Sequence, residues 1–211
     1  MILDKRDKDS ILRIAVLASG RGSNFEALCN GDTGNGRISL LITDNDEADV
    51  LRKASALGVE ALYMSPGRFR TKFGETEESE WTRLLMDRGI ELVCLAGLMR
   101  IIKGSMLEEF RGRIMNIHPS LLPSFPGLHA QKQALDYGVR ITGCTVHYVD
   151  ADVDTGPIIL QKAVYVKDDD TVETLSGRIL QQEHIAYSEA VRLYCSGVFT
   201  DSGRYILKTE E

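Results

Sequence analysis

The chain has 211 residues, of which 43% are hydrophobic and 27% charged, and its formal net charge is -6 at pH 7. These values are typical of one globular domain with its own core and exclude a disordered chain. The acidic balance argues against non-specific binding to nucleic acid, which needs a basic surface, but a local cluster of donors can still bind a small anion.

Four cysteines are spread along the chain without a C-x-x-C pair: Cys29, Cys94, Cys144 and Cys195. Their spacing gives no support to a zinc site. Two of them lie in apolar runs, where a free thiol usually acts as a small buried hydrophobe, and this fits a reducing compartment. The charged first ten residues lack the apolar segment of a signal peptide, and no apolar run reaches membrane-spanning length. We therefore expect a cytoplasmic protein without a membrane partner.

Strand and helix signals alternate along most of the chain. The apolar run at residues 11–19 is continuous, as in a parallel strand buried on both faces. Glycines at positions 58 and 89 follow periodic segments and mark the ends of helices. Further strands are predicted at residues 37–45, 59–65, 90–98 and 113–118, and helices directly after the first strand and at residues 46–57, 76–88 and 105–110.

Repeated strand–helix–strand units predict right-handed crossovers and an α/β fold with a doubly wound, mostly parallel, Rossmann-like sheet. The later part differs, because strands at 141–150 and 157–166 flank a short acidic turn and predict an antiparallel C-terminal hairpin. A long C-terminal helix is expected at 171–195. No repeat divides the chain, so residues 1–211 are interpreted as one domain, with a frayed first ten residues and an appended tail at 202–211.

A glycine loop, G-R-G-S-N at residues 20–24, joins the first strand to its helix. Backbone N–H groups at a helix N-terminus bind phosphate, and glycines let a ligand approach the backbone. Ser23 and Glu26 have the spacing of a capping box. Phe25 replaces the third glycine of a dinucleotide fingerprint, and no G-K-[ST] closes a P-loop, so a single phosphate is the favoured ligand. A tight turn without a ligand is the alternative.

Asn116 and His118 stand two residues apart at the end of the strand predicted at 113–118, so they share one face. Ligands of open α/β sheets bind at the carboxyl ends of strands, and Pro119 ends the ladder there. The loop that follows, at 121–130, is rich in proline and is interpreted as a stiff wall beside the histidine, or else as a wide crossover. A histidine satisfied by a neighbour is the structural alternative.

Two acidic features stand out in the later part of the chain. The turn at residues 150–157 lacks the ligand spacing of an EF-hand, so calcium is not indicated, but one of its carboxylates can meet His118 and stabilise the protonated ring. Glu183 interrupts the apolar stripe of the long helix. A buried acid is costly unless it is paired, so its partner is either a substrate amine or an internal arginine or lysine.

Four segments recur in a known order and spacing: S-G-R-G-S-N at 19–24, A-G-L-M-R-I-I at 96–102, N-I-H-P-S-L-L-P-S-F-P-G-L at 116–128 and D-T-G-P-I at 154–158. Together they resemble the phosphoribosylglycinamide formyltransferase family, the folate-dependent enzymes of purine synthesis. The resemblance extends from about residue 11 to residue 195. The third segment with the later D-x-G is specific for the wider formyltransferase superfamily, and the glycine loop indicates the glycinamide ribonucleotide member.

The resemblance implies that a formyl group passes from 10-formyltetrahydrofolate, a cosubstrate, to the amine of glycinamide ribonucleotide, without a metal or a covalent intermediate. The catalytic residues would be Asn116, His118 and Asp154. The phosphate would be held by Gly22, Ser23, Asn24 and, in the basic loop at 66–74, Lys72, with Arg68 and Arg70 as competitors. Glu183 would hold the substrate amine end.

The same resemblance assigns the folate pocket to Met99, Arg100, Ile101, Ile102, Val149 and Asp150. It divides the domain into a phosphate-binding part at about 11–110 and a folate-binding, catalytic part at about 111–200. Two histidines are left open: His147 is either near the site or an ordinary core residue, and His129 is expected to cap the helix after the proline loop.

Other functions compete with this interpretation. A formyltetrahydrofolate hydrolase would share the three catalytic residues but would not need a phosphate loop, and a formyltransferase could act on another phosphorylated amine. A tRNA formyltransferase would need a further RNA-binding domain. From a different class, a nucleotide-binding regulator would have no use for the donor pair at the strand end. The expected partners are small molecules and not nucleic acid, with a monomer or a homodimer equally open.

Overall fold

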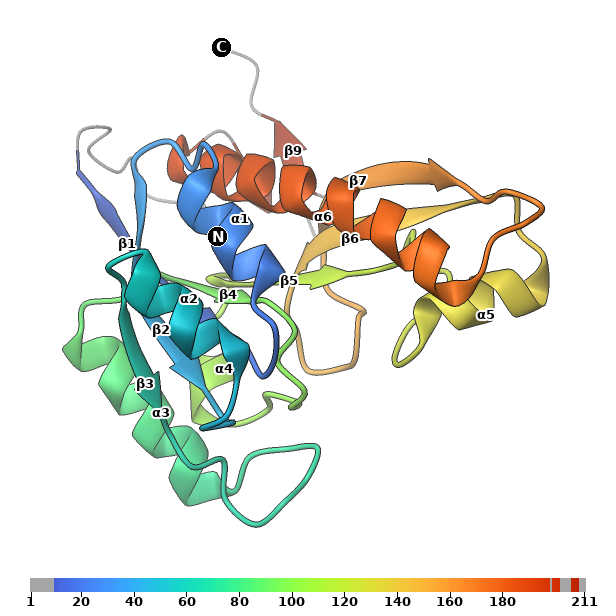
Figure 1. The fold of residues 1–211 in the computed structure, drawn as a ribbon. Coiled ribbons are helices and arrows are strands. Elements are labelled where there is room, and N and C mark those ends of the chain that lie inside the picture. Colours follow the sequence, from blue (N-terminus) through green and yellow to red (C-terminus); the bar gives the residue numbers. More distant parts are fainter. Residues whose placement is uncertain (1–9, 198, 202–205, 209–211) are drawn as a thin grey trace.

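A computed structural model describes residues 10–197, 199–201 and 206–208 of the chain. Its main sheet contains β1 (Leu12–Leu17), β2 (Gly36–Thr43), β3 (Glu60–Tyr63), β4 (Leu92–Leu95), β5 (Ile114–His118), β6 (Ile141–Tyr148) and β7 (Ile158–Tyr165). The strand order is β3-β2-β1-β4-β5-β6-β7 (Figure 1). The first five strands pair in parallel, whereas β6 is antiparallel to both β5 and β7. The predicted parallel sheet with an antiparallel hairpin is confirmed.

The described part of the chain has six helices, of which the first five connect these strands and the last follows β7: α1 (Ser23–Asn30), α2 (Asp49–Ala56), α3 (Glu75–Asp87), α4 (Ser105–Glu109), α5 (Ala130–Tyr137) and α6 (Val172–Cys195). Of the predicted tail, β9 (Ile206–Lys208) pairs with β8 (Phe199–Asp201). The rest of that tail, and residues 1–9 of the predicted frayed start, lie outside the described residues.

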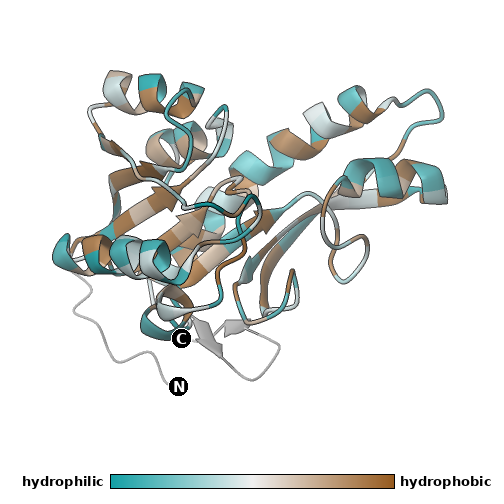
Figure 2. Ribbon diagram, turned by 90° about the horizontal axis from the view of Figure 1, so that it is seen from below, coloured by the Kyte–Doolittle hydropathy of each residue, from teal (hydrophilic) through white to brown (hydrophobic). Residues whose placement is uncertain are grey.

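The sheet is covered on both faces, which explains the continuous apolar run of β1. Ile14 and Val16 belong to one core cluster, together with residues of α1, α2 and α6. Ala15 and Leu17 belong to a second cluster on the other face, together with residues of α3 and α4. In Figure 2 the strands are largely hydrophobic, whereas the helices carry hydrophilic residues between hydrophobic ones. Successive side chains of a strand point to opposite faces, so a strand between two helical layers has no polar face.

The register of the parallel strands brings three functional segments to one edge of the sheet. Leu17 at the end of β1 pairs with Leu95 at the end of β4, and Leu95 pairs with Asn116 in β5. The glycine loop follows β1, and the segment 96–102 follows β4. Both therefore start at the level of Asn116 across the sheet.

The start of α1 is correctly predicted, but the predicted capping box is wrong. The N-cap residue is Gly22, with φ 69°, and no side chain caps the helix; the Gly22 carbonyl accepts from the Glu26 amide at 3.0 Å. An added Cβ at Gly22 would lie 2.3 Å from Val50 Cγ2, so the close approach of α2 requires glycine. His129 likewise occupies the N-cap position of α5 with a left-handed backbone and no side-chain cap. Side-chain caps need an extended N-cap backbone, which neither position has.

Tyr187 fastens α6 to the centre of the sheet. Its hydroxyl lies 3.0 Å from the carbonyl oxygens of both Leu95 and Met115, and the side chain is fully buried. One O–H proton is thus shared between the last residue of β4 and a residue of β5. The bond holds the long helix over the strand ends that carry Asn116 and His118.

We predict that Tyr187→Phe lowers the free energy of unfolding by roughly 1 kcal/mol, because two buried carbonyl groups lose a shared donor. Urea denaturation followed by circular dichroism measures the change. Tyr165→Phe is the matched control, since the Tyr165 residue is 76% exposed and its hydroxyl can be solvated. Equal unfolding free energies for the two variants would contradict this role of Tyr187.

Candidate functional site

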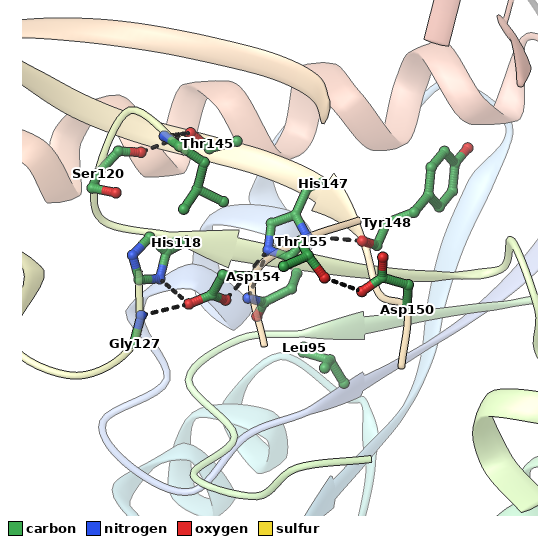
Figure 3. A network of polar contacts seen from close by, with 12 residues as sticks. Leu95, His118, Ser120, Gly127, Thr145, His147, Tyr148, Asp150, Asp154 and Thr155 are labelled. Carbon is green, nitrogen blue, oxygen red and sulfur yellow. Dashed lines mark hydrogen bonds and ion pairs between the residues drawn. The ribbon is translucent and has the colours of Figure 1, made fainter. Parts of the chain in front are cut away.

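His118 is the last residue of β5, and its ring lies against the Asp154 carboxylate (Figure 3) and the Phe125 carbonyl. Its Nε2 is 2.9 Å from the carbonyl oxygen of Phe125, and its Nδ1 is 3.3 Å from Asp154 Oδ2. A carbonyl oxygen only accepts, so Nε2 carries the proton of that bond. When Nδ1 also carries a proton, it can donate to Asp154 Oδ2, and the ring then satisfies both neighbours.

Asp154 contacts His118, His147 and the proline loop. Its Oδ2 accepts from the Gly127 amide at 2.8 Å, and its Oδ1 lies 3.6 Å from His147 Nε2. Burial alone would raise the pKa of this carboxyl, but the His147 ring, the Gly127 amide and the His118 ring together hold the pKa below its ordinary value. The backbone of Asp154 has φ 57°, a conformation that few residues other than glycine adopt. Surrounding bonds therefore hold an ionised acid in a strained backbone.

His147 links Asp154 to Asn116. Its Nδ1 donates to the Tyr148 carbonyl oxygen at 2.8 Å, and its Nε2 is 3.2 Å from Asn116 Nδ2, which donates to it when the ring is neutral. The side-chain amide has two N–H groups, so this bond leaves one of them for a ligand. The antiparallel pairing of Asn116 with His147 creates the contact, and only this register distinguishes the residue from a core histidine.

The proline loop lies against His118, as expected from the sequence, and a buried polar network fixes it there. Thr145 Oγ1 donates to the Ser120 carbonyl at 2.7 Å and accepts from the Leu122 amide at 3.0 Å. Gln161 Nε2 donates to the Leu122 carbonyl at 2.9 Å. These contacts from β6 and β7 hold the loop in the position where Phe125 offers its carbonyl to His118.

The turn that carries Asp154 closes through a glycine and an internal hydrogen bond. An added Cβ at Gly156 would lie 1.8 Å from the Tyr148 carbonyl oxygen, so no other residue fits. Thr155 Oγ1 donates to Asp150 Oδ1 at 2.7 Å. Asp150 thus shapes the turn with its side chain.

Glu183 pairs with the glycine loop and not with a cation. Asn24 Nδ2 donates to Glu183 Oε2 at 2.8 Å, and the Glu183 residue is only 7% exposed. Burial raises the pKa of Glu183, and the Asn24 bond lowers it by a smaller amount. Asn24 Oδ1 is buried and has no hydrogen-bond partner in the described part of the chain. The two side chains place a carboxylate and a spare acceptor together, which suits a ligand rich in N–H groups.

The remaining predicted residues differ in how they are placed. The Met99 and Ile101 residues are 58% and 38% exposed, whereas Ile102 is buried in the core cluster beneath α3 and α4. Lys72 lies in the basic loop, where its ammonium group is 4.6 Å from the centre of the Phe69 ring. Because the Ile102 side chain is buried in the core, only the backbone of Ile102 is available to a ligand.

Arg100 and Val149 face inward as well. The Arg100 guanidinium forms a nearly buried ion pair with Asp44, with Nε 2.6 Å from Asp44 Oδ2. The Val149 side chain packs against the core, and its amide donates to the Ile114 carbonyl at 3.0 Å. Neither the Asp44 pair nor the Phe125 carbonyl was predicted, because no local sequence pattern signals either contact.

Other chemistries have less support in the described residues. Within these ranges no group of three or more His, Cys, Asp and Glu side chains could hold a metal ion. Burial, together with Glu183, raises the pKa of Cys144 to about 12, and burial, with Glu26, raises that of Cys29 to about 11. Such thiols are poor nucleophiles near neutral pH. None of the described helices combines the length and the apolar character needed to span a bilayer.

Comparison with known proteins identifies the family. Residues 12–191 match the family model described as formyl transferase. The chain belongs to the formyl transferase family. It is 41% identical over 184 residues to the phosphoribosylglycinamide formyltransferase of Bacillus subtilis, a match that covers 85% of this chain and 93% of that protein. The resemblance inferred from the four sequence segments is confirmed.

Two further relatives agree with this assignment. A crystal structure of glycinamide ribonucleotide transformylase 1 from Symbiobacterium toebii has a TM-score of 0.89 and 46% sequence identity, with 95% of each chain covered. The trifunctional purine biosynthetic protein adenosine-3 of Gallus gallus is 45% identical over 191 residues, which are 88% of this chain. The chain spans only 19% of the length of that protein.

We predict that Glu183→Gln does not destabilise the unliganded protein at pH 7. An acid with a raised pKa in the folded state binds more protons folded than unfolded, so its ionisation lowers stability as the pH rises above the ordinary Glu pKa of about 4.3. The glutamine side chain would avoid that cost and still accept from Asn24. Urea denaturation between pH 4 and pH 8 measures the difference, which should grow with pH in favour of the variant. If the difference in unfolding free energy between the two proteins instead shifts in favour of the wild type between pH 4 and pH 7, this account is refuted.

Proposed function

We propose that the protein transfers the formyl group of 10-formyltetrahydrofolate, its cosubstrate, to the amine of glycinamide ribonucleotide in purine synthesis. The observation that carries the proposal is the chain of contacts from Asn116 through His147 and Asp154 to His118. The names of the similar proteins from Bacillus subtilis and Symbiobacterium toebii support the choice of the ribonucleotide.

The transfer needs donors where negative charge develops. The amine nitrogen attacks the formyl carbon, a new C–N bond forms, and the carbonyl electrons move onto the formyl oxygen. The free N–H of Asn116 and the Nε2–H of His118 donate to that oxygen, each contribution being worth about 3 kcal/mol in comparable sites. The Phe125 carbonyl, which accepts from His118 in the free protein, gives up its place to the formyl oxygen.

Collapse of the intermediate restores the C=O bond and breaks the bond from the formyl carbon to the folate nitrogen. One proton leaves the attacking amine and one arrives at the departing nitrogen, so the charges balance. Asp154 is the acceptor on this path, because it lies against His118 and is ionised, so that it can receive the proton and pass it on. It also stabilises the positive charge of the His118 ring while the oxyanion exists.

Recognition of the substrates divides between two parts of the one domain. In the part at 11–110, Gly22, Ser23, Asn24 and Lys72 bind the ribonucleotide phosphate. The start of α1 supports this, since its first amides follow a left-handed glycine and no side chain caps the helix. Glu183 receives the amine end of the same substrate, next to Asn24.

The folate occupies the part at 111–200 together with the segment after β4. Its pocket is bordered by Met99, Arg100, Ile101, Ile102, Val149 and Asp150, mainly through the backbone where the side chains are buried. The exposed Met99 and Ile101 side chains support a flat apolar contact with the pterin ring. The reaction in this proposal involves only small molecules. A cytoplasmic location, a monomer or homodimer, and the lack of a metal stay predictions.

The alternatives make different demands on the same residues. A formyltetrahydrofolate hydrolase has no use for the Asn24–Glu183 pair, and a formyltransferase for another phosphorylated amine would use the same pair with a different acceptor. A nucleotide-binding regulator has no need to hold an ionised Asp154 against His118. The paired Asn24 and Glu183 therefore favour a transferase with a phosphorylated amine substrate.

Folate deformylation followed by ultraviolet absorbance tests the proposal. We predict deformylation that requires glycinamide ribonucleotide, and a loss of about 100-fold or more in kcat for His118→Ala and for Asn116→Ala, because each removes an oxyanion donor. His129→Asn is the control, since this exposed histidine tolerates replacement by a residue suited to a left-handed backbone. Deformylation without the ribonucleotide would identify a hydrolase, and ligand binding without turnover would identify a regulator.

A further inference from the structure

The Arg100 side chain makes contacts that are not needed for a residue that only borders the folate pocket. It lies in the segment 99–102 that the proposed function assigns to folate, yet its guanidinium turns away into a nearly closed space. The exposed fractions of the Arg100 and Asp44 side chains are 11% and 6%. Arg100 Nη1 also donates to the carbonyl oxygens of Phe69 and, at 3.3 Å, of Lys72. One guanidinium thus meets acceptors from two separate segments, the end of β2 and the basic loop.

The backbone joins the same segments. Ile101 forms a parallel bridge with Lys72, and the Ile101 amide donates to the Thr71 carbonyl oxygen at 2.9 Å. The Met99 amide donates to Ser19 Oγ at 3.0 Å, directly before the glycine loop. The segment at 99–102 therefore runs alongside the basic loop and is fastened to the end of β1.

Residues next to Asp44 connect it to the proposed phosphate site by hydrogen bonds. It follows the end of β2, and the next residue, Asn45, donates from Nδ2 to the Ser19 carbonyl at 3.3 Å. Val50 donates from its amide to the Gly20 carbonyl at 3.2 Å. An unpaired carboxylate here would repel an incoming phosphate, because like charges repel most strongly where water is excluded. Arg100 neutralises that carboxylate.

We propose that Arg100 is a positioning residue which couples the phosphate site to the folate site. By holding Asp44, Phe69 and Lys72 together it fixes the basic loop against the folate segment and cancels the charge of Asp44. The identity of the two ligands rests on the proposed function, but the coupling of the two segments does not. A lysine has too few donors in a fixed plane to replace it.

The first test uses the free protein and needs no ligand. Arg100→Met keeps the apolar stem and removes the charge. Amide hydrogen exchange should become faster in residues 69–72 and 99–102 together, by about tenfold, because a buried ion pair that loses one partner is strongly destabilised. The exposed ion pair of Arg52 and Asp49 provides the matched control, Arg52→Met, which should change neither segment. Faster exchange in only one of the two segments, or in neither, overturns the coupling.

The second test separates coupling from simple loss of structure. In Arg100→Met the KM values for ribonucleotide and for folate should both rise about tenfold while kcat changes less than about threefold, a size typical of coupling between sites. Asp44→Asn with Arg100→Met should lower the ribonucleotide KM by about threefold relative to Arg100→Met and leave the folate KM raised, since the charge is gone but the basic loop is still not fixed. A lower kcat with unchanged KM values overturns the proposal.

The two tests also separate this inference from the proposed function. A wild-type protein without ribonucleotide-dependent turnover refutes the proposed function, and hydrogen exchange then still decides whether Arg100 joins the two segments. If Arg100→Met folds poorly, the double variant carries the test, because it contains no unpaired buried charge. Failure of the double variant to lower the ribonucleotide KM overturns the electrostatic part of the proposal.

Discussion

The site depends on one constraint: a buried carboxylate must be surrounded by donors if it is to remain charged. Asp154 meets this requirement with the Gly127 amide and the His118 ring, and the His147 ring lies 3.6 Å from its other oxygen. These three groups come from different segments, so ionisation of Asp154 holds the proline loop, β5 and β6 in one arrangement. The left-handed backbone at Asp154 is tolerated because these bonds outweigh its strain.

The same region contains buried polar groups that serve function and do not increase the stability of the fold. Glu183 is buried with Asn24 as its partner, and Asn24 leaves one acceptor without a hydrogen bond among the described residues. Asp44 and Arg100 form an ion pair that apolar residues of similar size could replace without loss of stability. Asn24, Asp44 and Arg100 lie on segments that follow the ends of parallel strands, the place where open α/β sheets bind ligands, and Glu183 joins them from α6. The rest of the sheet, by contrast, packs between two apolar layers.

Sequence reasoning predicted the features that follow from local pattern. Continuous apolar runs identified the strands of the parallel sheet, and the motif around Asn116 and His118 identified the edge that carries the site. Contacts set by tertiary structure were missed. Neither the partner of Glu183 nor the direction of the Arg100 side chain has a local signal, because each depends on a residue far away in the chain. The capping box at Ser23 failed because the close approach of α2 imposes a left-handed glycine at the N-cap position.

A crystal structure of the wild-type protein with glycinamide ribonucleotide and unformylated tetrahydrofolate would test the central claim most directly. The account predicts that the ribonucleotide amine and the folate nitrogen that carries the formyl group lie about 3–4 Å apart, as reacting groups must, beside the side chains of Asn116 and His118. It also predicts the phosphate at the start of α1. Ligands bound with the amine remote from Asn116 and His118, or with the phosphate far from the glycine loop, would contradict it.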